Sequence, residues 1–361
     1  VFKFFHNLLP KLYTYILSDK CFFLKEFWCI ICDMIKITIG ENQGNQRLDR
    51  FLKKYFPEAS LSHIYRLIRK DVKINGKRKR PETLIETGDQ LILYMAEEEA
   101  SLLRGGSRRT EKKPSAKKQF SVVYEDSQIL IADKPLGLLT HGDYREKKNH
   151  LANQVVSYLI EKGDYDPRTE KTFVPSPANR LDRNTTGLVL FGKTLASLQE
   201  LNRMLRERDG IEKLYMTIAT GKIDYPLKLK DTMTKDVSRN LVSAGDDTGK
   251  IMETDIVPIE VSEGRYSYTL AAANIHTGRT HQIRVQLAGA GFPIIGDSKY
   301  GNDAVNRYVK EKYGLTTQLL HAYKLRFGLC REDGPLSYLS GREFECSLPE
   351  RFQRIKKDIF G

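Results

Sequence analysis

The stretch from Glu97 to Gln119, EEEASLLRGGSRRTEKKPSAKKQ, constrains the fold most, because it separates two regions with clear hydrophobic patterns. It mixes glycine, serine, proline and charge and offers little to bury, which is typical of a linker. A length of 361 residues is enough for two domains. We therefore predict a small domain over residues 34–96, a flexible basic linker over 97–119 and a large domain over 120–361.

Residues 1–33 differ from the rest of the chain. They contain the only tryptophan, Trp28, and show no clean period, whereas a strand-like pattern, MIKITIG, begins at Met34. We predict that these residues are an upstream extension or that Met34 is a natural start; a short helix packed on the small domain is the alternative. The apolar run FWCIIC is too short to cross a membrane, and charges interrupt every candidate signal sequence.

The charge of the chain points to a polyanionic partner. The formal net charge is +13, and nucleic acid is the commonest partner of such a chain, with an anionic membrane surface as the competitor. The five cysteines are sparse and odd in number, which argues against a disulfide framework. Cys29 and Cys32 lack a second ligand pair, so we predict no metal site. We expect a cytoplasmic protein.

The small domain reads as two helices followed by a hairpin and a strand. RLDRFLKKYF and SLSHIYRLIRK each carry apolar residues at helical spacing. The predicted buried faces are Leu48, Phe51, Leu52 and Tyr55 in the first helix and Leu61, Ile64, Tyr65 and Ile68 in the second. Ser60 or Ser62 can cap the second helix. Asn75-Gly76 predicts a tight turn between strands, and TGDQLILYM a closing strand.

Basic residues gather where the second helix meets the hairpin. We predict that they contact phosphates, because one sign of charge extends over two elements, although a solvated surface is the usual explanation. The residues of this basic cluster are Arg66, Arg69, Lys70, Lys73, Lys77 and Arg78.

The large domain mixes strands and helices without a regular βαβ rhythm, which indicates an α+β fold. Strands are predicted in FSVVYEDSQILIADKP, GLVLFGK, EKLYMTIATG and RYSYTLAAANI, and helices in NHLANQVVSYLIEK, TLASLQELNRMLRER and THQIRVQLAGAG. The polar segment 223–250 has no clear pattern.

Three residues of the large domain are candidates for chemistry. Asp182 precedes a polar turn that leads into a buried strand, where an acid can be rigid and still face a cleft. Arg284 lies at the edge of the buried face of a short helix, where we expect an arginine to pair with a carboxylate. Tyr215 lies in a strand between apolar neighbours. The plain alternatives are a solvated loop acid, a surface cation and a core tyrosine.

Five motifs in order give the large domain a resemblance to a known family. They are LIADKPLGLLTH, NRLDRNTTGL, EKLYMTI, HTGRTHQIRVQLAGAGFPIIGDSKYG and LLHAYKLRF. Together they resemble the RluA-type RNA pseudouridine synthases. Residues 46–95 resemble the RNA-binding domain of small-subunit ribosomal protein S-four. The resemblance implies a pseudouridine synthase catalytic domain with a mixed, mainly antiparallel sheet, preceded by a small S-four-like α+β domain.

The resemblance also implies a role for each candidate. Asp182 would be the catalytic aspartate, the group that attacks or assists when the uracil–ribose bond breaks. Arg284 would pair with it, Tyr215 would stack on the target base, and Arg180 would help displace that base or contact the backbone. The sequence departs from the usual motif at Asn179, often histidine, and at Asn184, often acidic.

The resemblance implies an isomerase that needs no cofactor, since the reaction involves no redox step or energy input. We expect RNA as the partner, ribosomal rather than transfer RNA, and a monomer. A catalytically inactive RNA-binding or ribosome-assembly protein on the same fold is the main alternative. A glycoside hydrolase is a second one, but such enzymes usually need two carboxylates, and the motif region offers only Asp182. The sequence leaves the modified uridine open.

Overall fold

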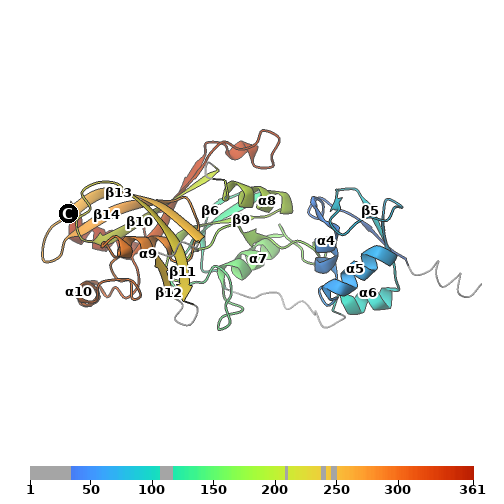
Figure 1. Cartoon of the computed structure of the whole chain (residues 1–361), viewed down its shortest axis with the longest axis horizontal. Coiled ribbons are helices and arrows are strands. Elements are labelled where there is room, and N and C mark those ends of the chain that lie inside the picture. Colours follow the sequence, from blue (N-terminus) through green and yellow to red (C-terminus); the bar gives the residue numbers. More distant parts are fainter. Residues whose placement is uncertain (1–33, 106–116, 208–209, 237–240, 245–249) are drawn as a thin grey trace, which may run out of the picture. The chain divides into compact units, whose positions relative to one another are not determined.

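The computed structural model describes residues 34–105, 117–207, 210–236, 241–244 and 250–361. The predicted extension, with Cys29 and Cys32, and most of the predicted linker lie outside these residues. The chain divides into two compact units, residues 1–112 with 168–173 and residues 113–167 with 174–361. We call them the N-terminal and C-terminal units (Figure 1). No helix in the described ranges has the length and apolar character needed to span a membrane.

The N-terminal unit is a small α+β structure. Its antiparallel sheet has the order β1-β5-β3, and β2 pairs separately with β4. Its elements are β1 (Met34–Thr38), β2 (Gln46–Arg47), α4 (Leu48–Tyr55), α5 (Leu61–Lys70), β3 (Val72–Ile74), β4 (Leu84–Ile85), β5 (Gln90–Tyr94) and α6 (Glu97–Leu103).

The two predicted helices of this unit are present, but the predicted face is right for only one of them. All four apolar residues predicted to be inside α4 are buried. In α5, Leu61 is 57% exposed and Tyr65 is 40% exposed, so that prediction is wrong for both. Ile64 and Ile68 are buried as predicted, and Leu67 completes the buried face. The helical period fits both the predicted set of residues and the observed one, and the packing against the sheet decides between them. Ser60 caps α5 by accepting a hydrogen bond from the amide of residue 63.

The start of the predicted linker is helical. Residues 97–103 form α6, so this part of the linker prediction is wrong. Ala100 is fully buried in the core of the unit, and Arg104 pairs with Glu97 and lies over the ring of Tyr55. The glutamates that made the stretch look solvated occupy the first turn, where the helix dipole favours negative charge.

The predicted Asn75-Gly76 turn forms, but the hairpin is short. Both residues have left-handed backbones, with φ of 49° and 77°, and a bridge joins Ile74 to Lys77. Two left-handed central residues are the requirement of the tight hairpin turn that this pair favours. No strand follows Lys77 directly, and the next one is β4.

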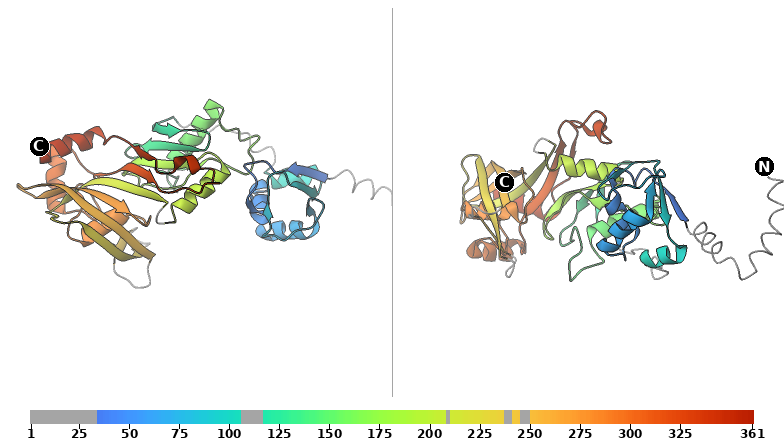
Figure 2. Two further views of the ribbon diagram at one scale, coloured as in Figure 1. Left: turned by 90° about the horizontal axis from the view of Figure 1, so that it is seen from above. Right: turned by 45° about the vertical axis from the view of Figure 1, so that its right-hand side comes forward.

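The C-terminal unit is built on one large sheet. Among the described residues it has eleven strands, and its main path runs β12-β11-β13-β14-β10-β15-β9-β7-β6, with β16 on β15 and β8 on β9. Only β15 and β9 are parallel neighbours; the other pairs are antiparallel. The prediction of an α+β fold with a mixed, mainly antiparallel sheet is confirmed. Figure 2 shows the yellow and orange strands β11, β13 and β14 side by side in one layer.

The strands and helices predicted in this unit are present. The strands are β6 (Ser121–Glu125), β7 (Ile129–Lys134), β8 (Ser176–Pro177), β9 (Thr186–Gly192), β10 (Ile211–Thr220), β11 (Leu227–Asp236), β12 (Leu241–Ala244), β13 (Lys250–Ser262), β14 (Tyr268–Ile275), β15 (Leu320–Phe327) and β16 (Glu343–Glu345). The helices are α7 (Leu151–Lys162), α8 (Leu195–Met204), α9 (Gln282–Gly289), α10 (Asp303–Tyr313) and α11 (Glu350–Phe360), with a 3₁₀ turn at Ser337–Leu339. The polar segment without a clear pattern contributes β11, β12 and the start of β13.

A glycine holds the two parallel strands together. Gly187 has a φ of 109°, and a Cβ atom there would lie 2.2 Å from the carbonyl oxygen of Ala322. The backbones of β9 and β15 therefore approach more closely than any side chain would allow. This contact fixes the start of β9, and with it the loop that ends at Thr185.

Candidate active site

The loop between β8 and β9 carries Asp182 and is pinned from both sides. The hydroxyl of Thr140 donates to the carbonyl of Leu181 (3.0 Å) and accepts from its amide (3.1 Å). The carbonyl of Asp182 accepts from the amide of Thr185 at 3.1 Å, which closes a turn. A rigid loop can hold a carboxylate in one place without burying it.

Lys134 anchors the same loop from below. The residue is fully buried, and its Nζ donates to the carbonyls of Pro135 (3.1 Å), Leu138 (2.8 Å) and Arg183 (3.1 Å). Burial lowers the pKa of Lys134 to about 7, although the charges of Asp182 and a neighbouring aspartate oppose this shift. These three carbonyls hold its ammonium in place, so we assign it a structural role at the strand exit.

Arg284, in α9, joins Asp182 to a buried acid. One terminal nitrogen, NH1, donates to Oδ2 of Asp182 at 3.0 Å. Its Nε and NH2 donate to the two oxygens of Asp297 at 2.7 and 2.8 Å. The side chain of Asp297 is 0% exposed and that of Arg284 is 6% exposed. This two-bond fork fixes the guanidinium plane, and the third contact fixes the carboxylate of Asp182.

Arg284 and Asp297 affect each other's pKa more strongly than burial does. Burial raises the pKa of Asp297, but the hydrogen bonds and charge of Arg284 outweigh it and hold that pKa below its usual range. Burial likewise lowers the pKa of Arg284, and Asp297 more than compensates. Both groups are therefore charged at neutral pH, and the pair acts as one rigid unit.

The carboxylate of Asp182 has one oxygen engaged and one open. Oδ2 accepts from Arg284 and lies 3.8 Å from Nε2 of His281. Within the part of the chain that the structure describes, no hydrogen bond reaches Oδ1. The side chain is 28% exposed. An acid that is fixed at one oxygen and accessible at the other can act on a bound molecule.

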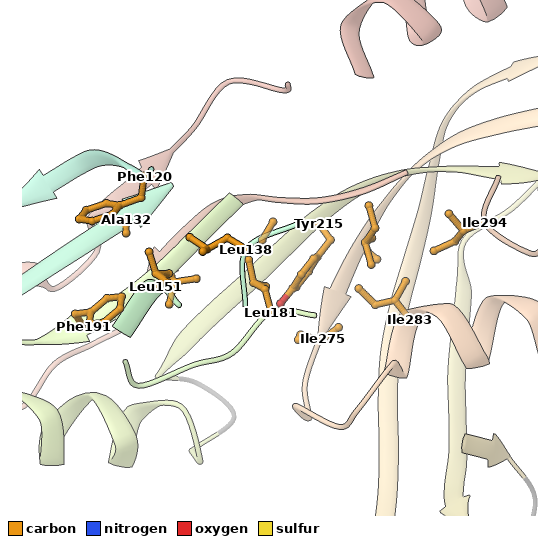
Figure 3. Close-up of a cluster of buried hydrophobic side chains, with 14 of the residues drawn as sticks. Phe120, Ala132, Leu138, Leu151, Leu181, Phe191, Tyr215, Ile275, Ile283 and Ile294 are labelled. Carbon is orange, nitrogen blue, oxygen red and sulfur yellow. The ribbon is translucent and has the colours of Figure 1, made fainter. Parts of the chain in front are cut away.

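Tyr215, on β10, forms the apolar wall beside Asp182. The residue is 5% exposed and belongs to the cluster that contains Leu181, Ile275 and Ile283. Figure 3 shows it between Leu181 on one side and Ile283 on the other. Burial, and then the charge of Asp182, raise the pKa of Tyr215, so the phenol keeps its proton. Tyr215 is therefore part of the core and also a neighbour of Asp182.

His281 completes the surroundings of the acid. It precedes α9 with a left-handed backbone, φ 56°, and its Nδ1 lies 2.9 Å from the hydroxyl of Tyr300. The ring of Tyr300 lies under the guanidinium of Arg284, 5.2 Å from its central carbon. Burial lowers the pKa of His281, even though the charge of Asp182 opposes this. The ring is therefore a neutral, oriented neighbour of the acid.

Comparison with known proteins identifies the family. A family model described as RNA pseudouridylate synthase matches residues 128–289. Ribosomal large subunit pseudouridine synthase C of Escherichia coli (strain K12) is 31% identical over 300 residues, which cover 81% of this chain and 88% of that relative. The chain belongs to the RNA pseudouridylate synthase family. The prediction of an RNA pseudouridine synthase, an isomerase that acts on RNA, is confirmed, and the glycoside hydrolase alternative is wrong.

The chain is also similar to other proteins. The protein of the same name from Haemophilus influenzae is 30% identical over 301 residues, covering 81% of this chain and 86% of the relative. A solved structure, Human RNA Pseudouridylate Synthase Domain Containing 4, is 19% identical with a TM-score of 0.49, and it covers 66% of this chain and 92% of that chain.

The structure of this pseudouridine synthase brings three of the predicted site residues together. Asp182, Arg284 and Tyr215 meet as described, and Arg180 lies exposed two residues before the acid. The basic cluster belongs to the N-terminal unit, on α5, β3 and the turn after it. Five of its six residues are exposed, and Lys73 is half-buried with its Nζ 5.0 Å from the ring centre of Tyr94. No acidic residue in the described ranges forms an ion pair with the cluster.

Sequence reasoning missed the partner that holds Arg284. Asp297 lies in GDSKYG, the end of the fourth motif of the resemblance, to which the sequence analysis gave no role. It is the only acid in GDSKYG, and that was the one sequence signal for a carboxylate partner of Arg284. Two histidines of the same region also form hydrogen bonds, His276 with Asp255 at 2.8 Å and His281 with Tyr300 at 2.9 Å. Nε2 of His281 lies 3.8 Å from the carboxylate of Asp182.

Proposed function

We propose that this pseudouridine synthase isomerises specific uridines of large-subunit ribosomal RNA, with Asp182 as the catalytic acid or nucleophile. The observation that carries the assignment to Asp182 is its carboxylate, fixed by Arg284 at one oxygen and open at the other. The choice of RNA is supported by relatives named as ribosomal large subunit pseudouridine synthases. Transfer RNA is the competing substrate. We further propose a cytoplasmic monomer that needs no cofactor.

The reaction requires a fixed carboxylate and no net change of oxidation state. The bond between C1′ and N1 of uridine breaks, and a bond between C1′ and C5 forms. The proton on C5 leaves and N1 gains one, so substrate and product are isomers. Asp182 assists while the base is detached, and the clamped Arg284 keeps the carboxylate at the place where the ribose must sit. Fixed groups of this kind need no reorganisation during the reaction.

The target base must leave the RNA stack before Asp182 can reach it. Extrusion costs a few kcal/mol, of which stacking on an aromatic ring recovers about 1–3 kcal/mol. Tyr215 provides that ring beside the acid, and Arg180 is the nearby cation that would help displace the base. A cavity of about 530 Å³ next to the loop, lined in part by Arg145 and Arg183, supplies positive charge for the neighbouring nucleotides.

Two substitutions at Tyr215 separate stacking from proton transfer. If the ring only stacks, Tyr215→Phe keeps the rate of pseudouridine formation within about tenfold, whereas Tyr215→Leu loses about 10–100-fold, the value of one stacked base. The measurement is single-turnover pseudouridine formation, with thermal unfolding as the control for the core. A Phe variant as slow as the Leu variant would show that the hydroxyl is essential.

The basic cluster of the N-terminal unit makes a separate prediction. Removing two phosphate contacts with Arg66→Ala and Lys70→Ala should weaken RNA binding and reduce the slope of log K against log salt by about 1.4–1.8. Lys36→Ala is the matched control, since Lys36 is exposed on β1 of the same unit. Filter binding from low to moderate salt gives both quantities. An unchanged salt slope would remove this cluster from the RNA footprint.

The choice of substrate is tested by mapping. The full chain is incubated with transcripts of large-subunit ribosomal RNA and with transfer RNA, and pseudouridine is located by carbodiimide modification and primer extension. We expect discrete new stops in the ribosomal transcript, absent with Asp182→Asn. Stops confined to transfer RNA would contradict the proposed substrate and leave the family assignment intact.

A further inference from the structure

A buried lysine without a partner lies on the same strand as Tyr215. Lys213 is 8% exposed, and within the described ranges its ammonium has no hydrogen bond or ion pair. Buried ammonium groups are costly unless they are paired. Burial lowers the pKa of Lys213. Lys213 is thus a buried cation without a charge partner among the described residues.

Lys213 lines a cavity of about 460 Å³ that is enclosed mainly by β10, β11, β13 and β14. Leu229, Thr254 and Ile275 line it from the neighbouring strands. Ile275 also belongs to the apolar cluster around Tyr215, beside which Figure 3 draws it. The cavity therefore lies next to the apolar wall of the active site.

The carboxylates around this cavity already have partners. Glu253 forms an ion pair with Lys230 at 3.0 Å, and Asp255 shares a hydrogen bond with Nε2 of His276 at 2.8 Å. The other two acids in the lining form ion pairs with arginines outside it: Glu212 with Arg326 at 2.9 Å, and Glu207 with Arg203.

Two cations are then left over. Lys213 and the exposed Lys228 have no carboxylate partner among the described residues. The cavity is thus suited to an incoming anion.

The strand geometry sets the distance between this cavity and the reaction. Residues two apart on a strand point to the same face and lie about 7 Å apart. Lys213 and Tyr215 are related in this way on β10. One nucleotide bridges such a distance, so a base against Tyr215 would bring an adjacent phosphate of its own strand to Lys213.

We propose that the cavity around Lys213 is a phosphate subsite that binds a phosphodiester of the RNA next to the flipped uridine. The proposal rests on the proposed function, because it takes the base at Tyr215 as the anchor. Lys213 binds and positions the substrate, and it takes no part in bond breaking. Lys228, at the rim, adds a second positive charge.

The test measures binding without turnover. Asp182→Asn protein is titrated with a nine-nucleotide RNA that contains one central uridine among adenosines, so that the uridine sets the register. Adding Lys213→Met should weaken binding about tenfold, the effect of one charge-assisted contact, and reduce the salt slope by about 0.7. Lys310→Met is the matched control, an exposed lysine of α10 away from the cavity, and should change neither quantity.

A second measurement changes the RNA, and its first arm, in the Asp182→Asn protein, leaves Lys213 intact. Each phosphodiester near the uridine is replaced in turn by a neutral methylphosphonate. One linkage should weaken binding to the Asp182→Asn protein about tenfold and have no effect once Lys213→Met is present. Equal effects at every linkage in both proteins, or unchanged binding by Lys213→Met, would overturn the subsite. Failure of every protein to bind RNA would instead overturn the proposed function.

Discussion

Asp182→Asn is expected to lower the rate of pseudouridine formation by at least about 10³-fold, the scale seen when a catalytic group is removed from a preorganised site. The amide keeps the shape of the side chain and can still accept from Arg284, but it cannot supply a negative charge to the ribose. The rate is measured in single turnover, by digesting the RNA and separating pseudouridine from uridine.

Stability and RNA affinity should change little in this variant. Asp182 is 28% exposed, and its contact with Arg284 is one of three that the guanidinium makes. Thermal unfolding and filter binding serve as the controls. A variant that retains a tenth or more of the parent rate, with the fold intact, would remove Asp182 from the centre of the mechanism.

Asp297→Asn is expected to lower the free energy of unfolding by about 3–5 kcal/mol, because it leaves Arg284 buried without its main counter-charge. For a unit of this size the melting temperature should fall by about 10 °C. Activity should fall as well, since the guanidinium that fixes Asp182 is no longer held by two bonds. Glu343→Gln is the matched control: it breaks ion pairs with Arg326 and Lys324 to a half-exposed carboxylate, each worth about 0–1 kcal/mol.

The stability effect of Asp297 has a defined pH dependence. Its pKa is lower in the folded protein than the ordinary value of 3.8. Its contribution to stability is therefore complete above about pH 4 and is lost as the pH falls through the folded pKa. The stability gap between parent and Asp297→Asn should narrow on the acid side and stay constant near neutrality. A gap that widens in acid would contradict the assignment of charge to this pair.

The candidate site shows how far sequence reasoning reaches. The motifs around Asp182, Tyr215 and Arg284 implied a family and a pairing, and the structure places Arg284 3.0 Å from the acid. Asp297 stands in the same motif as Arg284, but the motif does not show their pairing, because that depends on a contact between the helix that holds Arg284 and a later loop. The role of Lys213 could not be predicted either. Strand alternation indicates that its side chain faces inward, but it does not show whether an acidic side chain pairs with it.

The errors in the fold have similar causes. In α5 the apolar residues fit two overlapping stripes, and the local period could not show that Leu67 packs inside while Leu61 and Tyr65 face outward. In α6 three glutamates suggested a solvated linker, although one buried alanine and favourable placement at a helix start suffice for a short helix. Local patterns predict the type of element well when one stripe is clear, whereas tertiary contacts decide the exposed face and the boundaries.

Release of tritium from C5 of uridine reports whether this chain isomerises uridine through Asp182. Large-subunit ribosomal RNA transcribed with uridine tritiated at C5 is incubated with the full chain and with Asp182→Asn. We expect release of label by the parent protein, matched by pseudouridine in the digested RNA, and none by the variant above background. Equal release by both proteins would contradict the role of Asp182, and no release by the parent from ribosomal or transfer RNA, despite tight binding, would favour an inactive RNA-binding protein on the same fold.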